Sequence, residues 1–154
     1  MVQAQTLYND LIYFTDKNKL YISQYIPSKA DINISSATLH IRQTTDMKNY
    51  NSQTFFDEHS DGTMSRWSIK FNIDCDKKVP LTLSFRLPKW AKSQVTVIIN
   101  NIPANYTVEN GYINISKTWE NDTVSILFGS EIKMERLADM PYLAAAVDGP
   151  IVLA

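Results

Sequence analysis

The stretch Leu81–Asn101 most constrains the fold of this chain. Apolar and polar side chains alternate along two segments, LTLSFRL and VTVIIN, which a Pro-Lys-Trp corner joins. A period of two places one face of each segment against a core and the other toward water. Val, Ile, Thr and Phe favour strands, and Pro88 ends the first segment. The stretch is therefore predicted to form two strands at the centre of an all-β domain.

The same alternation continues along much of the remaining chain, most clearly in Trp67–Ile73. Further strands are predicted at Leu20–Ile26, Asp31–Ser35, Thr38–Thr44, Tyr112–Ser116, Val124–Phe128, Glu131–Arg136, Tyr142–Val147 and Ile151–Ala154. Turn-forming residues separate them at Asp16–Lys19, Asp74–Lys78, Asn100–Ala104, Asn110–Gly111 and Trp119–Asp122. About a dozen short strands without a long helix predict an all-β fold, an antiparallel β-sandwich of jelly-roll or related type.

The N-terminal residues depart from this pattern. Residues 2–13 mix helix formers with apolar positions, and a helix this short is marginal on its own. We therefore predict that residues 1–14 are a short helical remnant of a preceding domain or a linker, and that residues 15–154 form the β-sandwich domain. Residues 45–65 are its longest predicted loop, and long loops in compact domains are often functional.

Composition and charge exclude several classes of function. Hydrophobic residues at 44% and charged residues at 20% are typical of a globular domain. The net charge of −1 gives no electrostatic footprint for nucleic acid or for an anionic membrane. No run approaches the ~20 apolar residues that cross a bilayer. The start, MVQAQTLYND, is not a signal peptide, so export of a bacterial parent to the periplasm or the exterior requires a signal outside these residues.

Residue types that carry chemistry are sparse. The single cysteine, Cys75, has only His40 and His59 to share a zinc site with, so we expect no metal and no cofactor. Cys75 is interpreted as a small, partly buried core residue. The run Asp57–Asp61 is the one acidic cluster beside a histidine, and we interpret it as a solvated loop. No catalytic constellation is predicted.

Aromatic residues are the candidates for sugar binding, because sugar faces stack on flat rings. Trp67 falls on the apolar face of its predicted strand, whereas Trp90 and Trp119 lie at strand-edge corners. Aromatic residues at such corners usually cap a core or pack at an interface, and we favour that structural role for both. Trp90, Trp119 and Tyr50, which lies on the long loop, are the predicted sugar-binding or domain-interface residues.

A series of short motifs resembles one known family. Each motif is weak alone, but together they follow the family's order and spacing over nearly the whole chain. They are LYISQYIPS (20–28), ATLHIRQTTDM (37–47), LTLSFRLPKWAK (81–92), VTVIINN (95–101), GYINISKTWENDTVSILF (111–128) and DGPIVLA (148–154). The chain resembles the β-sandwich region downstream of the helical barrel in bacterial glycoside hydrolase family 127, the β-L-arabinofuranosidase type.

The chain departs from the family's pattern at several turns. Lys89 stands where the family has a glycine before the corner tryptophan, and Asn101 replaces the glycine of a Val-Asn-Gly turn. Asn121-Asp122 replaces Gly-Asp, and Thr45–Lys48 replaces Thr-Asp-Tyr-Pro. These are surface and turn changes, which leave the predicted sandwich in place.

The resemblance implies that the catalytic residues lie elsewhere. In the family, an (α/α)6 barrel that precedes the sandwich carries a cysteine nucleophile, a cysteine-rich zinc site with a glutamate ligand, and an acidic proton donor. Cys75 matches none of these positions, so no catalytic or metal-binding residue is carried over. The first 14 residues resemble the end of the last barrel helix. The chain is therefore expected to be a piece of a longer protein.

Three hypotheses follow. The leading hypothesis is a non-catalytic β-sandwich domain of a larger bacterial glycoside hydrolase, which supports the catalytic barrel of the same parent chain and walls its substrate cleft. The second is a carbohydrate-binding module that takes a plant-derived glycan on its aromatic residues or on the loop Tyr50–Asp61. The third is a structural or adhesion domain unrelated to any enzyme.

Overall fold

The computed structural model describes residues 11–46, 65–91, 95–130, 132–136, 139–140 and 142–153. No helix in these residues is long and apolar enough to cross a membrane. One short 3-10 helix, η1, spans Lys89–Ala91. The strands are β1 (Tyr13–Asp16), β2 (Lys19–Ile22), β3 (Ser28–Ile34), β4 (Ala37–Asp46), β5 (Ser65–Arg86), β6 (Val95–Ile99), β7 (Ile102–Pro103), β8 (Thr107–Glu109), β9 (Tyr112–Ser130), β10 (Ile132–Arg136), β11 (Ala144–Asp148) and β12 (Ile151–Leu153).

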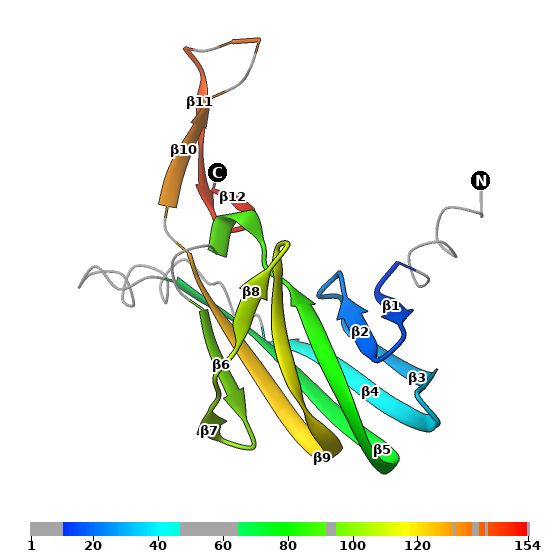
Figure 1. The fold of residues 1–154 in the computed structure, drawn as a ribbon. Helices are drawn as coiled ribbons and strands as arrows, with labels where there is room; N and C mark the ends of the chain where they lie inside the picture. Colours follow the sequence, from blue (N-terminus) through cyan, green and yellow to red (C-terminus); the bar gives the residue numbers. More distant parts are fainter. Residues whose placement is uncertain are drawn as a thin grey trace.

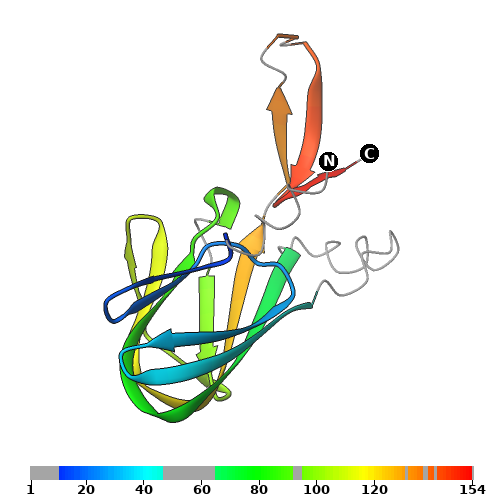
Figure 2. The ribbon, with the colours of Figure 1, turned by 90° about the vertical axis from the view of Figure 1, so that its right-hand side faces the viewer.

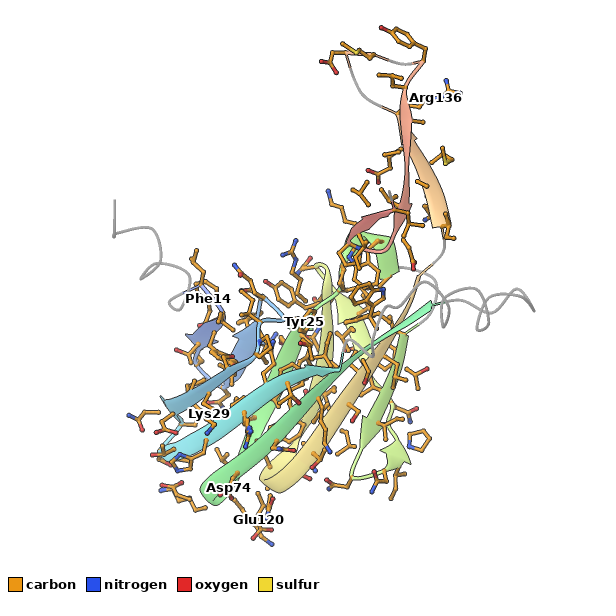
Figure 3. The ribbon with its side chains drawn as sticks, turned by 180° about the vertical axis from the view of Figure 1, so that it is seen from behind. Phe14, Tyr25, Lys29, Asp74, Glu120 and Arg136 are labelled. Carbon is orange, nitrogen blue, oxygen red and sulfur yellow. The ribbon has the colours of Figure 1, made fainter. Side chains whose placement is uncertain are left out.

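The two longest strands, β5 and β9, pair antiparallel in two registers. They are 65–74 with 121–130 and 79–86 with 112–119. Between the two registers, residues 75–78 of β5 stand opposite Glu120 alone. An unequal number of residues on paired strands is a β-bulge, which bends the strands and increases their twist. The long hairpin therefore has a built-in corner, which lies near the labelled Asp74 and Glu120 in Figure 3.

The bend brings the two halves of the hairpin face to face. Phe71 and Phe85 belong to the two halves of β5, yet their ring centroids lie only 4.9 Å apart. Figure 2 shows the sheet curving over at this corner. A single hydrogen-bonded sheet therefore supplies both layers of the sandwich.

The remaining strands extend each layer. In one layer β3, β4, the first half of β5, the second half of β9, β6 and β7 lie in that order. In the other layer the order is β1, β2, the second half of β5, the first half of β9 and β8. All of these pairs are antiparallel except β2 with β5, which is parallel. The all-β sandwich predicted from the sequence is confirmed.

The core lies between the two layers. Leu81, Leu83 and Phe85 are buried, as their alternation predicts. Along β9 the buried side chains belong to odd-numbered residues up to Trp119 and to even-numbered residues from Asp122 to Phe128. The bend accounts for this change, because an irregular residue in a strand reverses the face to which later side chains point.

Two segments that the sequence predicts as turns are bends within strands. Asp74–Lys78 and Trp119–Asp122 were expected to separate short strands, but each lies inside one continuous strand. Pairing continues on both sides of the bulge, so polar turn-forming residues here mark a bend and not a chain reversal. The predicted helical remnant at 1–14 falls mostly outside the described residues, and its last two residues already belong to β1.

Tight turns join three hairpins, each with two consecutive residues at positive φ. They are Ser35-Ser36 (53° and 80°), Asn100-Asn101 (50° and 67°) and Asn110-Gly111 (52° and 80°). Two such residues define the type I′ turn, which matches the twist of the flanking strands. Asn101 takes this conformation where the family pattern has glycine, because asparagine tolerates it better than other side chains.

The last three strands form a separate antiparallel sheet in the order β10-β11-β12. In Figures 1 and 2 the β10–β11 hairpin projects away from the sandwich. The predicted strands of this region are confirmed in position. The domain boundaries at 1–14 and 15–154 remain predictions.

The buried Asp122 carboxylate is hydrogen-bonded to several residues around the bend. Its side chain is 7% exposed. Its Oδ1 accepts hydrogen bonds from Lys117 Nζ at 2.6 Å and Asn100 Nδ2 at 2.7 Å, and its Oδ2 accepts one from the Glu120 backbone N–H at 3.2 Å. Asn100 Oδ1 accepts the backbone N–H of Thr123 at 2.8 Å. One carboxylate thus links both halves of β9 to the β6–β7 turn.

These bonds keep Asp122 charged. Burial alone raises the pKa of a carboxyl group, but the hydrogen bonds from Lys117, Asn100 and Glu120 outweigh burial, and the pKa of Asp122 lies below its usual value. Lys117 is also fixed by its position over the Trp119 ring, 4.9 Å from the centroid.

Replacing Asp122 tests the role of this corner. Asp122→Asn is expected to lower the free energy of unfolding by about 2 kcal/mol at neutral pH, because it leaves the Lys117 ammonium without its charged partner. Urea unfolding followed by circular dichroism measures the difference. Glu109→Gln, on the exposed strand β8, is the matched control and should change stability by less than about 0.5 kcal/mol.

The pH dependence of the same difference checks the cause. Because the folded pKa of Asp122 is depressed, its contribution is fully present above about pH 4, the ordinary carboxyl pKa, and is lost as the pH falls through the folded pKa. Wild type and Asp122→Asn should therefore converge in stability as the pH falls below about 4. A constant difference at all pH values would mean that the charge is not what Asp122 contributes.

Candidate functional site

Trp119 is a core residue. Its side chain is 0% exposed, and its Nε1 donates a hydrogen bond to the Leu81 carbonyl oxygen at 2.9 Å. It stands opposite Val79 at the bend. A fully buried ring cannot stack on a sugar or contact a neighbouring domain. The prediction that Trp119 is a sugar-binding or interface residue is therefore corrected to the structural role.

Trp90 lies at the other end of this half of β5, on helix η1. Its ring centroid is 6.0 Å from that of Trp67 and 5.8 Å from that of Phe128. Both tryptophans are half-buried, and Tyr25 extends the cluster with its ring 5.4 Å from Phe128. Trp90 thus covers one end of the core and still presents part of its ring to the surface. It remains a candidate interface or sugar contact.

The long predicted loop holds the remaining candidate residue. Tyr50 and the acidic run Asp57–Asp61 lie outside the described residues. Of the predicted site residues that the structure describes, Trp90 and Trp119 lie at opposite ends of the second half of β5 and are not brought together.

A shallow polar groove of about 250 Å³ lies on the outer face of the β3-β4-β5-β9 layer, beside the bend. Its polar side chains come from two neighbouring rows of cross-strand partners. One row is Asp31, His40, Asp74 and Asn121, and the other is Lys29, Arg42 and Asn72. Such a surface offers many hydrogen bonds to a polyhydroxylated ligand. The groove was not predicted from the sequence because its residues lie far apart in the chain.

Charges within the groove nearly cancel. His40 Nδ1 lies 2.6 Å from Asp31 Oδ1, and this hydrogen bond raises the pKa of His40, with further raising by Asp74 and Asp76. Lys29 and Arg42 supply two positive charges against Asp31 and Asp74. The groove therefore has no charge excess with which to select an ionic ligand, and the exposed ion pair is largely screened by water.

Cys75 lies in the bulge of β5, with its side chain buried. Burial raises the pKa of the Cys75 thiol to about 11, and the carboxylates of Asp74, Asp122, Asp76 and Glu120 contribute to the shift. The thiol is therefore protonated at neutral pH, and a protonated thiol is a poor nucleophile and metal ligand. Its interpretation as a buried core residue is confirmed.

The corner built on Asp122 was also not predicted as a unit. Asp122 was interpreted as a turn former, but it lies inside the continuous strand β9 and its carboxylate is buried with three hydrogen-bond partners. The change in periodicity between Trp119 and Val124 was the available signal, because an odd spacing of inward residues implies a bulge. Among the described residues no three His, Cys, Asp or Glu side chains gather as metal ligands.

Comparisons with known proteins identify the family. Residues 19–128 match the family described as "Beta-L-arabinofuranosidase, GH127 middle domain". No curated protein sequence matches the chain. The matched region contains both layers of the sandwich from β2 to most of β9, including the bend.

Solved structures share the fold. A family 127 β-L-arabinofuranosidase from Geobacillus stearothermophilus T6 superimposes with a TM-score of 0.67 at 20% identity, over 94% of this chain and 21% of its own. A second family 127 β-arabinofuranosidase gives a TM-score of 0.68 at 18% identity, over 92% and 23%. A glycoside hydrolase gives 0.66 at 18% identity, over 92% and 22%.

The chain thus spans less than a quarter of the length of these structures. The resemblance inferred from the ordered motifs is confirmed. With more than half of its residues matched, the chain belongs to glycoside hydrolase family 127, whose middle domain its β-sandwich represents.

Proposed function

We propose that this chain is a non-catalytic domain of a longer family 127 glycoside hydrolase, in which the β-sandwich supports a helical catalytic domain. The observation that carries the proposal is the match to the family's middle domain over residues 19–128, in a chain that spans 21–23% of the length of similar hydrolase structures. The substrate class we assign to the longer protein is an arabinose-containing plant glycan.

The environment of Cys75 supports a non-catalytic role. A cysteine nucleophile needs a thiolate, which a positive neighbour or a metal stabilises. Cys75 instead has burial and four carboxylates, all of which disfavour the thiolate. Among the described residues, the single cysteine therefore packs in the core and is poorly suited to act as a nucleophile.

A stable sandwich also suits a supporting role. The two layers are one continuous sheet, because β5 and β9 both run from one layer into the other. Large apolar side chains from both layers fill the space between them. Such a body can fix the position of a neighbouring domain that packs against its surface.

Glycan binding is the second candidate function, and the polar groove is the observation that favours it. Its amide, guanidinium and carboxylate groups can pair with sugar hydroxyls. Against it, the groove is shallow and none of its described lining residues is Phe, Trp or Tyr, whereas stacking on such rings supplies much of the affinity of sugar sites. The third hypothesis, a domain unrelated to any enzyme, is disfavoured by the family match.

Titration calorimetry with arabinose-rich and other plant-derived oligosaccharides distinguishes the two functions. We expect no saturable heat with any member of the panel. Saturable binding that Arg42→Ala abolishes would place a glycan site in the groove, and binding that Trp90→Ala abolishes would place it at the aromatic cluster. Lys133→Ala, on the separate β10–β12 sheet, is the control. Either result would mean that the domain is a glycan-binding module and not a supporting domain.

Alkylation measures the state of Cys75. Iodoacetamide should modify Cys75 in the folded chain about 100-fold more slowly than in the chain unfolded by guanidinium, because two pK units lower the thiolate fraction by that factor and burial blocks access. Mass spectrometry of the labelled chain gives the rates. A folded-state rate equal to the unfolded one would indicate a reactive thiol and contradict the assignment to the core.

A further inference from the structure

The separate β10–β12 sheet carries an unusual share of the exposed apolar surface. Six of the eleven exposed large apolar side chains of the described residues lie on it or at the tip of its hairpin. They are Ile132, Met134, Met140, Tyr142, Leu143 and Val152. Tyr142 is 81% exposed and Met134 is 66% exposed. Apolar patches of this kind mark interaction surfaces.

The register of the three strands assigns the exposed apolar side chains to the two faces of the sheet. Met134 pairs with Ala146, so the two side chains share a face with the neighbouring Ile132. Val152 pairs with Val147 on the opposite face. Large apolar side chains are thus exposed on both faces, whereas the inward faces of the main sheet are buried. A three-stranded layer gains stability when a second layer covers its apolar face.

The two faces of the sheet differ in their charged side chains. Lys133 and Glu135 share the face of Val152. The Ile132 and Met134 face carries the fully buried Asp148 opposite Ile132, and its exposed part has one charge, Arg136, which Figure 3 labels near the far end of the hairpin. A partner for this face must itself be apolar, because the face offers few groups to satisfy buried polar atoms.

The comparisons indicate where this partner comes from. The family match ends at residue 128, before β10 begins. The solved hydrolases leave only 6–8% of this chain outside the superposition, so the similarity extends into the β10–β12 region. In those structures the matched region is embedded in a chain more than four times as long. At least part of the β10–β12 region therefore has a counterpart within a much longer polypeptide.

We propose that the Ile132–Met134 face of the β10–β12 sheet is a docking surface for an apolar segment of the remaining polypeptide of the longer hydrolase. This inference rests on the proposed function and makes it specific, because it assigns the contact to this face and not to the aromatic cluster around Trp90. The docked segment supplies the second layer that the sheet lacks.

Hydrogen exchange followed by mass spectrometry tests the assignment. The 154-residue chain is compared with the longer polypeptide that contains it. Amides of β10, β11 and β12 should exchange at least about tenfold more slowly in the longer polypeptide, because docking opposes local opening. Amides in the centre of β5 and β9 serve as the internal control and should be equally protected in both.

The pattern of protection separates the two proposals. Protection gained around Trp90 but not in β10–β12 overturns this inference and leaves the supporting role intact. Protection gained nowhere overturns both. Protection gained in β10–β12 supports both.

Paired variants identify the face and the occupant. Met134→Ser should abolish the added protection in the longer polypeptide, whereas Glu135→Ser, its neighbour on the opposite face, should preserve it. Neither change should shift the melting temperature of the 154-residue chain, because both side chains are exposed. In sedimentation velocity the 154-residue chain should be monomeric. A dimer that Met134→Ser dissociates would assign the face to a second copy and overturn the proposal.

Discussion

The bend shared by β5 and β9 is the feature on which the rest of the structure depends. It turns one hairpin into two layers, and it brings Phe71 on one half of β5 against Phe85 on the other. A bulge bends a strand pair, and the buried Asp122 carboxylate holds the β6–β7 turn and both halves of β9 in one arrangement. Asp122 is buried beside fully buried Trp119, so a polar network and the core close the same corner.

Local patterns in the sequence were sufficient to predict the fold class and most strands. Alternation located Leu81–Phe85 and Trp67–Ile73 correctly, since burial of one face is all that such a pattern needs. The Asn110-Gly111 turn was also predictable, because few residues adopt positive φ. Alternation could not show that two predicted strands were halves of one strand. A bulge and a turn use the same polar residues, and only long-range pairing distinguishes them.

The candidate site was less predictable for a related reason. Trp119 and Trp90 both follow strand segments and look alike in sequence, yet one fills the core and the other covers its end. Their environments depend on partners such as Leu81 and Phe128 that lie far away in the chain. The polar groove is likewise assembled from four strands. The family, in contrast, was recognisable because the order of several weak motifs survives where each single motif does not.

Calorimetric unfolding of the longer polypeptide tests the central claim, that the sandwich supports a catalytic domain. If the domains are mechanically coupled, the sandwich and the catalytic domain should unfold in one cooperative transition, at a higher temperature than the 154-residue chain alone. Asp122→Asn should then lower the temperature of that shared transition. Two independent transitions, one of them at the melting temperature of the isolated chain, would contradict a supporting role.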